Sequence, residues 1–164
     1  MSATPSAGDS ELWAELVKRH WAFIHARMGI LRLSSAVELV RAGLHDGGGR
    51  VTALAMVPYL KEDERRALLP DLVAVASYGH GQTGEAIARI LELPRDWVLA
   101  NIEAQVEPLL AKGSYEEYRA LMELYDQLGA FALERQVAER AAASEDPDIR
   151  EAGEDFLEGL ATRA

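Results

Sequence analysis

The chain has 164 residues, no cysteine and a formal net charge of −10. The absence of cysteine excludes a disulfide framework, a thiolate zinc site and a cysteine nucleophile. The negative charge disfavours binding to duplex nucleic acid or to an anionic membrane surface. Because no apolar run approaches the roughly 20 residues that span a bilayer and the first eight residues lack a secretory signal pattern, we expect a cytoplasmic protein that binds neither nucleic acid nor membrane.

Residues 1–9 are small and polar and include a proline, which predicts a disordered N-terminal tail. From Ser10 onward the apolar residues recur with helical spacing, and alanine, leucine, glutamate and arginine, all good helix formers, dominate. We therefore expect one all-α domain over residues 10–164. Its predicted helices are 10–27, 35–45, 50–60, 63–77, 83–93, 96–111, 115–128, 130–143 and 147–161.

The first of these helices is apolar over much of its circumference. Trp13 and Trp21 are eight residues apart and share a face, together with Leu16 and other apolar residues. Such a helix either closes the end of a helical array or offers a surface to a partner. We favour closure of the array, because the ends of stacked repeats have to be covered.

Helix boundaries are marked by capping patterns and by a proline. Ser35 with Glu38, and Ser114 with Glu117, have the spacing of a capping box. Asp146 precedes a proline at a first helical position, where its carboxylate can cap the helix. Pro70 removes a backbone donor, so the helix predicted over 63–77 should kink or begin late.

The chain matches itself with a period of about 33 residues. Val57, Ile90, Leu124 and Phe156 are equivalent under this period, and a second series runs through Val40, Val73, Val106 and Val137. Two helices in each period are typical of stacked helical hairpins, whose neighbours must cover one another's apolar faces. The alternative is coincidental self-similarity of an amphipathic bundle. We predict an α-solenoid-like stack of three to four antiparallel hairpins.

The stretch from Glu145 to Ala152, followed by Phe156 and Leu157, resembles the second-helix signature of HEAT-type repeats, with an acidic turn, a β-branched residue, an arginine and small residues. Residues 51–61 resemble helical repeats that follow nucleotide-binding modules in bacterial signalling ATPases, and residues 110–117 resemble a tetratricopeptide turn. The resemblance covers most of residues 51–160. It implies an α-solenoid used for binding, and it carries no active site over to this chain.

The sequence contains no evident catalytic constellation. His20 and His25 are five residues apart rather than the four that place two ligands on one helical face. The run Gly47–Gly49 could cradle a phosphate, but without a lysine motif or a preceding strand it is better interpreted as a flexible loop. His80, between two glycines, suits a contact residue better than a preorganised catalyst. We predict no catalytic, cofactor-binding or metal-binding residues.

The function expected from these patterns is a non-catalytic protein–protein interaction module, an adaptor or scaffold. One alternative is a small acidic immunity or inhibitor protein that binds a basic partner, and the other is a HEAT-like repeat enzyme such as a lyase or DNA glycosylase. The tyrosines either contact a partner or wedge neighbouring hairpins apart, and both interpretations remain open. The candidate partner contacts are Tyr115, Tyr118, Tyr125, Trp13, Trp21 and His80.

Overall fold

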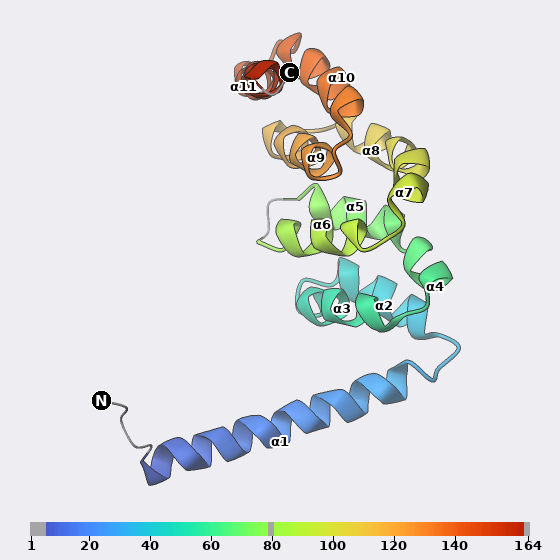
Figure 1. Cartoon of the computed structure of the whole chain (residues 1–164), viewed down its shortest axis with the longest axis vertical. Coiled ribbons are helices and arrows are strands. Elements are labelled where there is room, and N and C mark those ends of the chain that lie inside the picture. The colour runs from blue at the N-terminus through green and yellow to red at the C-terminus, as the bar shows by residue number, and fades with distance from the viewer. Residues whose placement is uncertain (1–5, 79–80, 163–164) are drawn as a thin grey trace.

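The computed structural model describes residues 6–78 and 81–162, and these form helices joined by short connections (Figure 1). The all-α prediction is confirmed, since the described residues include no strand. The helices, in chain order, are α1 (Ala7–Ile30), α2 (Ala36–His45), α3 (Arg50–Met56), the 3-10 helix η1 (Val57–Tyr59), α4 (Glu62–Arg66), α5 (Leu69–Ala76), α6 (Thr83–Leu91), α7 (Arg95–Asn101), α8 (Glu103–Leu110), α9 (Tyr115–Gln127), α10 (Phe131–Ala142) and α11 (Pro147–Thr162).

Three predicted helices are divided, two of them at a proline. The segment 63–77 forms α4 and α5, and Pro70 occupies the first turn of α5, where its missing donor removes no intrahelical hydrogen bond. Segment 50–60 becomes α3 followed by η1, with Pro58 in that short 3-10 helix. Segment 96–111 becomes α7 and α8, although Ile102 between them keeps helical angles. The late start predicted from Pro70 is therefore confirmed.

Capping groups determine where several helices begin. The Ser114 backbone amide donates to Glu117 Oε2 at 2.6 Å, and Asp146 Oδ1 accepts from the Asp148 amide at 2.9 Å, as predicted. The capping box predicted at Ser35 is wrong, because the Ser35 side chain makes no capping hydrogen bond. At the N-terminus a box between Ser6 and Asp9 starts α1 at Ala7, inside the predicted tail. Residues 1–5 lie outside the described residues.

The helices from α2 to α11, called the body below, contact one another in two series. The first series is α3, α6, α9 and α11, and each of these helices packs against the next. The second includes α2, α5 and α8, which also contact in sequence. Between the series, α2 packs on α3, α5 on α6, and α10 on both α9 and α11. Figure 1 shows the resulting layers arranged one above another, with α2 and α3 nearest to α1 and α10 and α11 at the opposite extreme.

The residues that match under the 33-residue period are buried at corresponding places in the body. Val57 of η1, Ile90 of α6 and Leu124 of α9 are fully buried, whereas Phe156 of α11 is only partly buried against the same core. Every member of the second set is also buried: Val40, Val73, Val106 and Val137. One continuous apolar cluster runs from α2 to α11, so each layer is covered by the next, as burial of one-sided helices requires.

Arginines connect layers that are distant in sequence. Arg95 of α7 donates through Nε to the Leu128 carbonyl at 3.1 Å, and its terminal nitrogen donates to the Gly129 carbonyl at 3.3 Å. These carbonyls end α9, where helices leave acceptors unsatisfied. Arg140 of α10 pairs with Glu107 of α8 at 3.0 Å. The guanidinium groups thus join α7 to the end of α9, and α10 to α8.

Candidate functional site

Helix α1 presents many apolar side chains outside the core. None of its residues is buried, although apolar side chains are numerous along it. The large exposed ones are Leu12, Trp13, Leu16, Val17, Trp21, Phe23 and Met28, with exposed fractions from 38% for Val17 to 74% for Leu12. An isolated helix is marginally stable in water and monomeric proteins rarely expose contiguous apolar patches of this kind. The helix therefore presents a surface suited to binding.

Only the C-terminal end of α1 touches the body. Ile30, together with Leu31 just beyond the helix, packs partly buried against the core, and the Arg27 guanidinium stacks 3.7 Å from the centre of the Tyr59 ring. From there α1 extends away beneath the layers (Figure 1). Closure of the array by this helix, the interpretation that the sequence favoured, is therefore wrong for most of its length. The alternative, a helix that offers its face to a partner, agrees with the exposure of Trp13 and Trp21.

The end of the body nearest α1 is also apolar. A hollow of about 280 Å³ lies there, lined by Ile30 of α1 and by residues of α2 and α3 that include Leu39 and Met56. Leu39 is 48% exposed and Val51 of α3 is 64% exposed. Gly43 of α2 permits a close approach to α3, because an added Cβ would lie 3.0 Å from the Cβ of Ala53. The first layer thus has an apolar end that α1 leaves largely uncovered.

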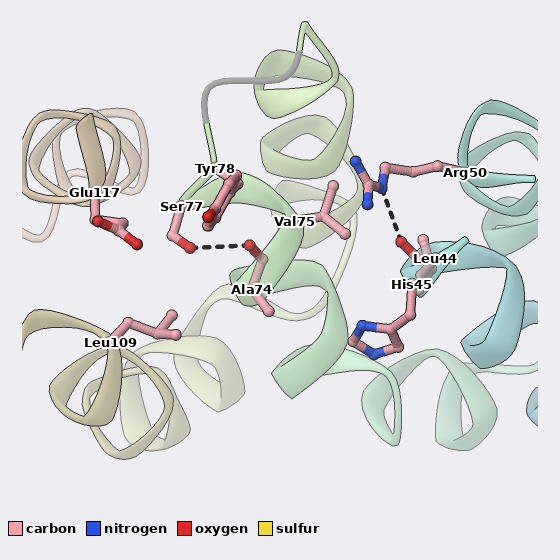
Figure 2. Close-up of a pocket in the computed structure, with 9 residues that line it drawn as sticks. All are labelled: Leu44, His45, Arg50, Ala74, Val75, Ser77, Tyr78, Leu109 and Glu117. Atoms are coloured by element: carbon pink, nitrogen blue, oxygen red, sulfur yellow. Dashed lines mark hydrogen bonds between the residues drawn. The ribbon is translucent and has the colours of Figure 1, made fainter. Parts of the chain in front are cut away.

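A second hollow, of about 320 Å³, lies where α2, α5, α8 and α9 meet (Figure 2). At one side His45 Nε2 lies 2.7 Å from Asp71 Oδ1, and the other oxygen of Asp71 accepts from Arg41 Nε at 3.1 Å. The Asp71 side chain is only 12% exposed. Hydrogen bonds to the carboxylates of Glu38 and then of Asp71 raise the pKa of Arg41. Two potentially cationic groups therefore hold one nearly buried carboxylate.

Among the described residues that line this hollow, the serine lies away from the pair of histidine and aspartate. Ser77 is buried and donates to the Ala74 carbonyl at 2.9 Å, and Figure 2 shows it on the other side of Ala74 and Val75 from His45. Arg50 donates through Nε to the Leu44 carbonyl at 2.8 Å. The His45–Asp71 pair therefore connects α2 to α5 structurally. No sequence pattern predicted this pair, because the two residues are 26 positions apart and match no motif.

The glycine run before α3 forms a tight turn organised by Asp46. The amides of Gly49 and Arg50 both donate to the Asp46 carbonyl, at 3.1 and 2.9 Å. A Cβ at Gly49 would lie 2.9 Å from Asp46 Oδ2, so a side chain there would displace that carboxylate. An acidic side chain next to these glycines is unfavourable for a phosphate. The turn thus serves the connection between α2 and α3.

The tyrosines proposed as partner contacts lie mainly in the core. Tyr125 is 1% exposed and Tyr118 is 7% exposed, while Tyr115 is partly buried against the same cluster. Burial raises the pKa of Tyr125 well above its ordinary value, with smaller contributions from Glu103 and Glu107. These positions agree with the packing alternative, and we assign Tyr118 and Tyr125 no contact with a partner. His80 lies outside the described residues.

Two further findings limit the kinds of site considered for the described residues. Within residues 6–78 and 81–162, no group of three or more histidine, aspartate or glutamate side chains is placed to hold a metal ion. In the same part of the chain, no helix combines the length and the apolar character needed to cross a membrane. Comparisons with protein-family models, with curated proteins and with solved structures find no match for this chain.

Proposed function

We propose that this protein is a non-catalytic interaction module, a helical-repeat scaffold of the α-solenoid type that binds another protein chain through α1. The observation that carries the proposal is the row of exposed apolar side chains along α1, which include Trp13 at 67% and Trp21 at 56%. Tryptophan in such a position is typical of binding surfaces, since it joins a large apolar area to a polar group.

The arrangement of the body supports the repeat interpretation. Helices of each series contact their counterparts in the next layer, and the residues related by the 33-residue period are buried except for Phe156, which is partly buried. Gly153 of α11 lies so close to α10 that an added Cβ would be 2.4 Å from the Ala142 nitrogen. Small residues at such contacts were part of the resemblance to HEAT-type repeats. A rigid stack of this kind can present one helix at a fixed position.

The apolar character of the exposed surfaces favours the adaptor over the two alternatives. An inhibitor of a basic partner would need a concentrated acidic face, and a DNA glycosylase would need a basic channel for the phosphates. The exposed face of α1 and the adjoining hollow beside Leu39 and Met56 are instead apolar. Burial of apolar area is the main favourable contribution to most protein associations.

The test uses a variant that changes the α1 face without touching the core. Leu16→Glu places a charge on the exposed apolar face, and Ala22→Glu places the same charge on the opposite, polar side of the helix. Proteins recovered with the wild-type chain and with A22E, but lost with L16E at an unchanged melting temperature, would support the proposal. Equal recovery by all three chains would show that α1 is not the binding surface.

A further inference from the structure

The charges of α1 indicate what covers its apolar face. We propose that this face binds a second copy of the chain, through antiparallel pairing of the two α1 helices. The inference rests on the proposed interaction function, because it names the occupant of that same surface. It adds an oligomeric state and a relative orientation that the function alone does not specify.

The size of the apolar face is sufficient for a symmetric pair. The seven large exposed side chains fall on roughly half of the helix circumference at 3.6 residues per turn, along a helix about 36 Å long. Covering these side chains would remove on the order of 800 Å² of accessible surface from each chain. This is the area that one partner contributes to an interface of standard size, about 800 Å². A two-fold symmetric contact uses the same surface on both copies, so this face has to be complementary to itself.

Two charged residues on the apolar face of α1 provide that self-complementarity. At 3.6 residues per turn, Asp9 and Arg27 fall between Leu16 and Trp21 on this face. Antiparallel pairing brings Asp9 of one helix near Arg27 of the other, and it also opposes the two helix dipoles. A parallel pair would place each of these charges beside its own copy.

The charges in the middle of α1 lie outside the apolar face. Glu15 lies 2.8 Å from Arg19 and 3.9 Å from Lys18. These side chains partly neutralise one another within each chain, and at 3.6 residues per turn they lie away from the second copy. Asp9 and Arg27 are therefore the charges that antiparallel pairing brings near their opposites.

The charge of the rest of the chain also favours an antiparallel pair. Because α1 carries three acidic and three basic side chains, its formal charge is zero, and the net charge of −10 resides in the remaining residues. A parallel pair would place two acidic bodies side by side. An antiparallel pair holds them at opposite ends of the paired helices, several times the screening length of about 8 Å at physiological salt.

The register of the pair follows from the limits of the apolar face. The large exposed residues extend from Leu12 to Met28, so their midpoint is His20. Superposing the two faces in antiparallel orientation places the two-fold axis beside His20. Trp13 then lies opposite Arg27 of the second copy, while the two Trp13 residues are about 21 Å apart, given 1.5 Å per residue.

The first experiment measures the molar mass of the purified full-length chain by light scattering across the micromolar range. We expect a concentration-dependent dimer for the wild type and for Ala22→Glu. Leu16→Glu should weaken dimerisation by at least tenfold with an unchanged melting temperature of the body, since Leu16 is exposed within one chain. A wild-type chain that stays monomeric, or an L16E variant that dimerises normally, would overturn the proposal.

The second experiment determines the orientation, and it benefits from the absence of native cysteine. A cysteine in place of His20 should form a disulfide-linked dimer under mild oxidation, because facing residues at the axis meet the distance limit for a disulfide. Cysteines at Trp13 or at the outward position Ala22 should not crosslink with themselves. Chains carrying Trp13→Cys and Arg27→Cys should crosslink when mixed. Self-crosslinking at Trp13 would indicate a parallel pair and contradict the proposal.

The outcomes also separate this inference from the proposed function. If the chain is monomeric and L16E alone loses a heterologous protein, the interaction function stands and the second-copy inference fails. If the chain is monomeric and the α1 amides are strongly protected from hydrogen exchange in the absence of any partner, the helix folds back on its own body. Both proposals then fail.

Discussion

Replacing Gly153 with alanine would insert a methyl group where α10 and α11 approach most closely. The new Cβ would lie 2.4 Å from the Ala142 nitrogen, 2.6 Å from the Ala138 oxygen and 2.8 Å from the Ala141 Cβ. Two of these neighbours are backbone atoms of a helix and have no rotamer that would relieve the contact. The methyl group can therefore be accommodated only if α11 moves away from α10.

The size of the effect is the difference between two opposing contributions. Overpacking typically costs about 1–3 kcal/mol, and the backbone neighbours place this site at the upper end. Replacing glycine with alanine inside a helix stabilises the helix by about 1 kcal/mol. The expected net loss is about 2 kcal/mol, which lowers the melting temperature of a chain of this size by about 4–8 °C.

Gly159 is the matched control for this substitution. It lies in the same helix, and an added Cβ would meet nothing within 4 Å. Gly159→Ala should therefore gain up to about 1 kcal/mol from helix propensity alone. The measurement is unfolding by heat and by urea followed by circular dichroism, with hydrogen exchange over residues 131–162 to locate the loosened region. If both alanine variants stabilise the chain equally, the close packing of α10 on α11 is refuted.

Four further predictions concern the core, the ion pairs, pH and nucleic acid. Ile90→Ala should cost about 2–4 kcal/mol because Ile90 is fully buried, whereas Leu91→Ala, at a residue 42% exposed, should cost under about 1 kcal/mol in the same urea titration. Asp71→Asn should lower the free energy of unfolding by about 1–3 kcal/mol, because it weakens the hydrogen bonds to the Arg41 and His45 side chains. Glu38→Gln should change that free energy by no more than about 0.5 kcal/mol. Similar losses for both variants would contradict the assigned role of Asp71. Burial raises the pKa of Tyr125 in the folded chain above its ordinary value of 10.0. The stability that this phenol provides is therefore present below that pH and lost as the pH rises above it. Tyr125→Phe should lose less stability than the wild type between pH 8 and pH 11, and an identical loss would contradict the burial argument. The purified chain should give no salt-dependent gel shift with duplex DNA at physiological salt, and a shift in the micromolar range would return the glycosylase alternative.

The sequence by itself determined the class of fold and several positions of the core. The spacing of apolar residues predicted helices nearly throughout, Pro70 predicted the late start of α5, and the 33-residue period selected Val57, Ile90 and Leu124, which are fully buried. These features depend on residues close together in the chain or on burial that repeats at a fixed interval, and both are visible in a linear pattern.

Only the tertiary structure decided which apolar residues find a partner within the chain. Leu12 of α1 and Leu124 of α9 occupy similar helical patterns, yet Leu12 is 74% exposed and Leu124 is fully buried. Tyr118 and Tyr125 could equally have faced a partner or the core, and they lie in the core. Amphipathicity shows that a helix has an apolar face, but it contains no information on what that face meets. The link between His45 and Asp71 was invisible for the related reason that their proximity depends on how α2 and α5 pack.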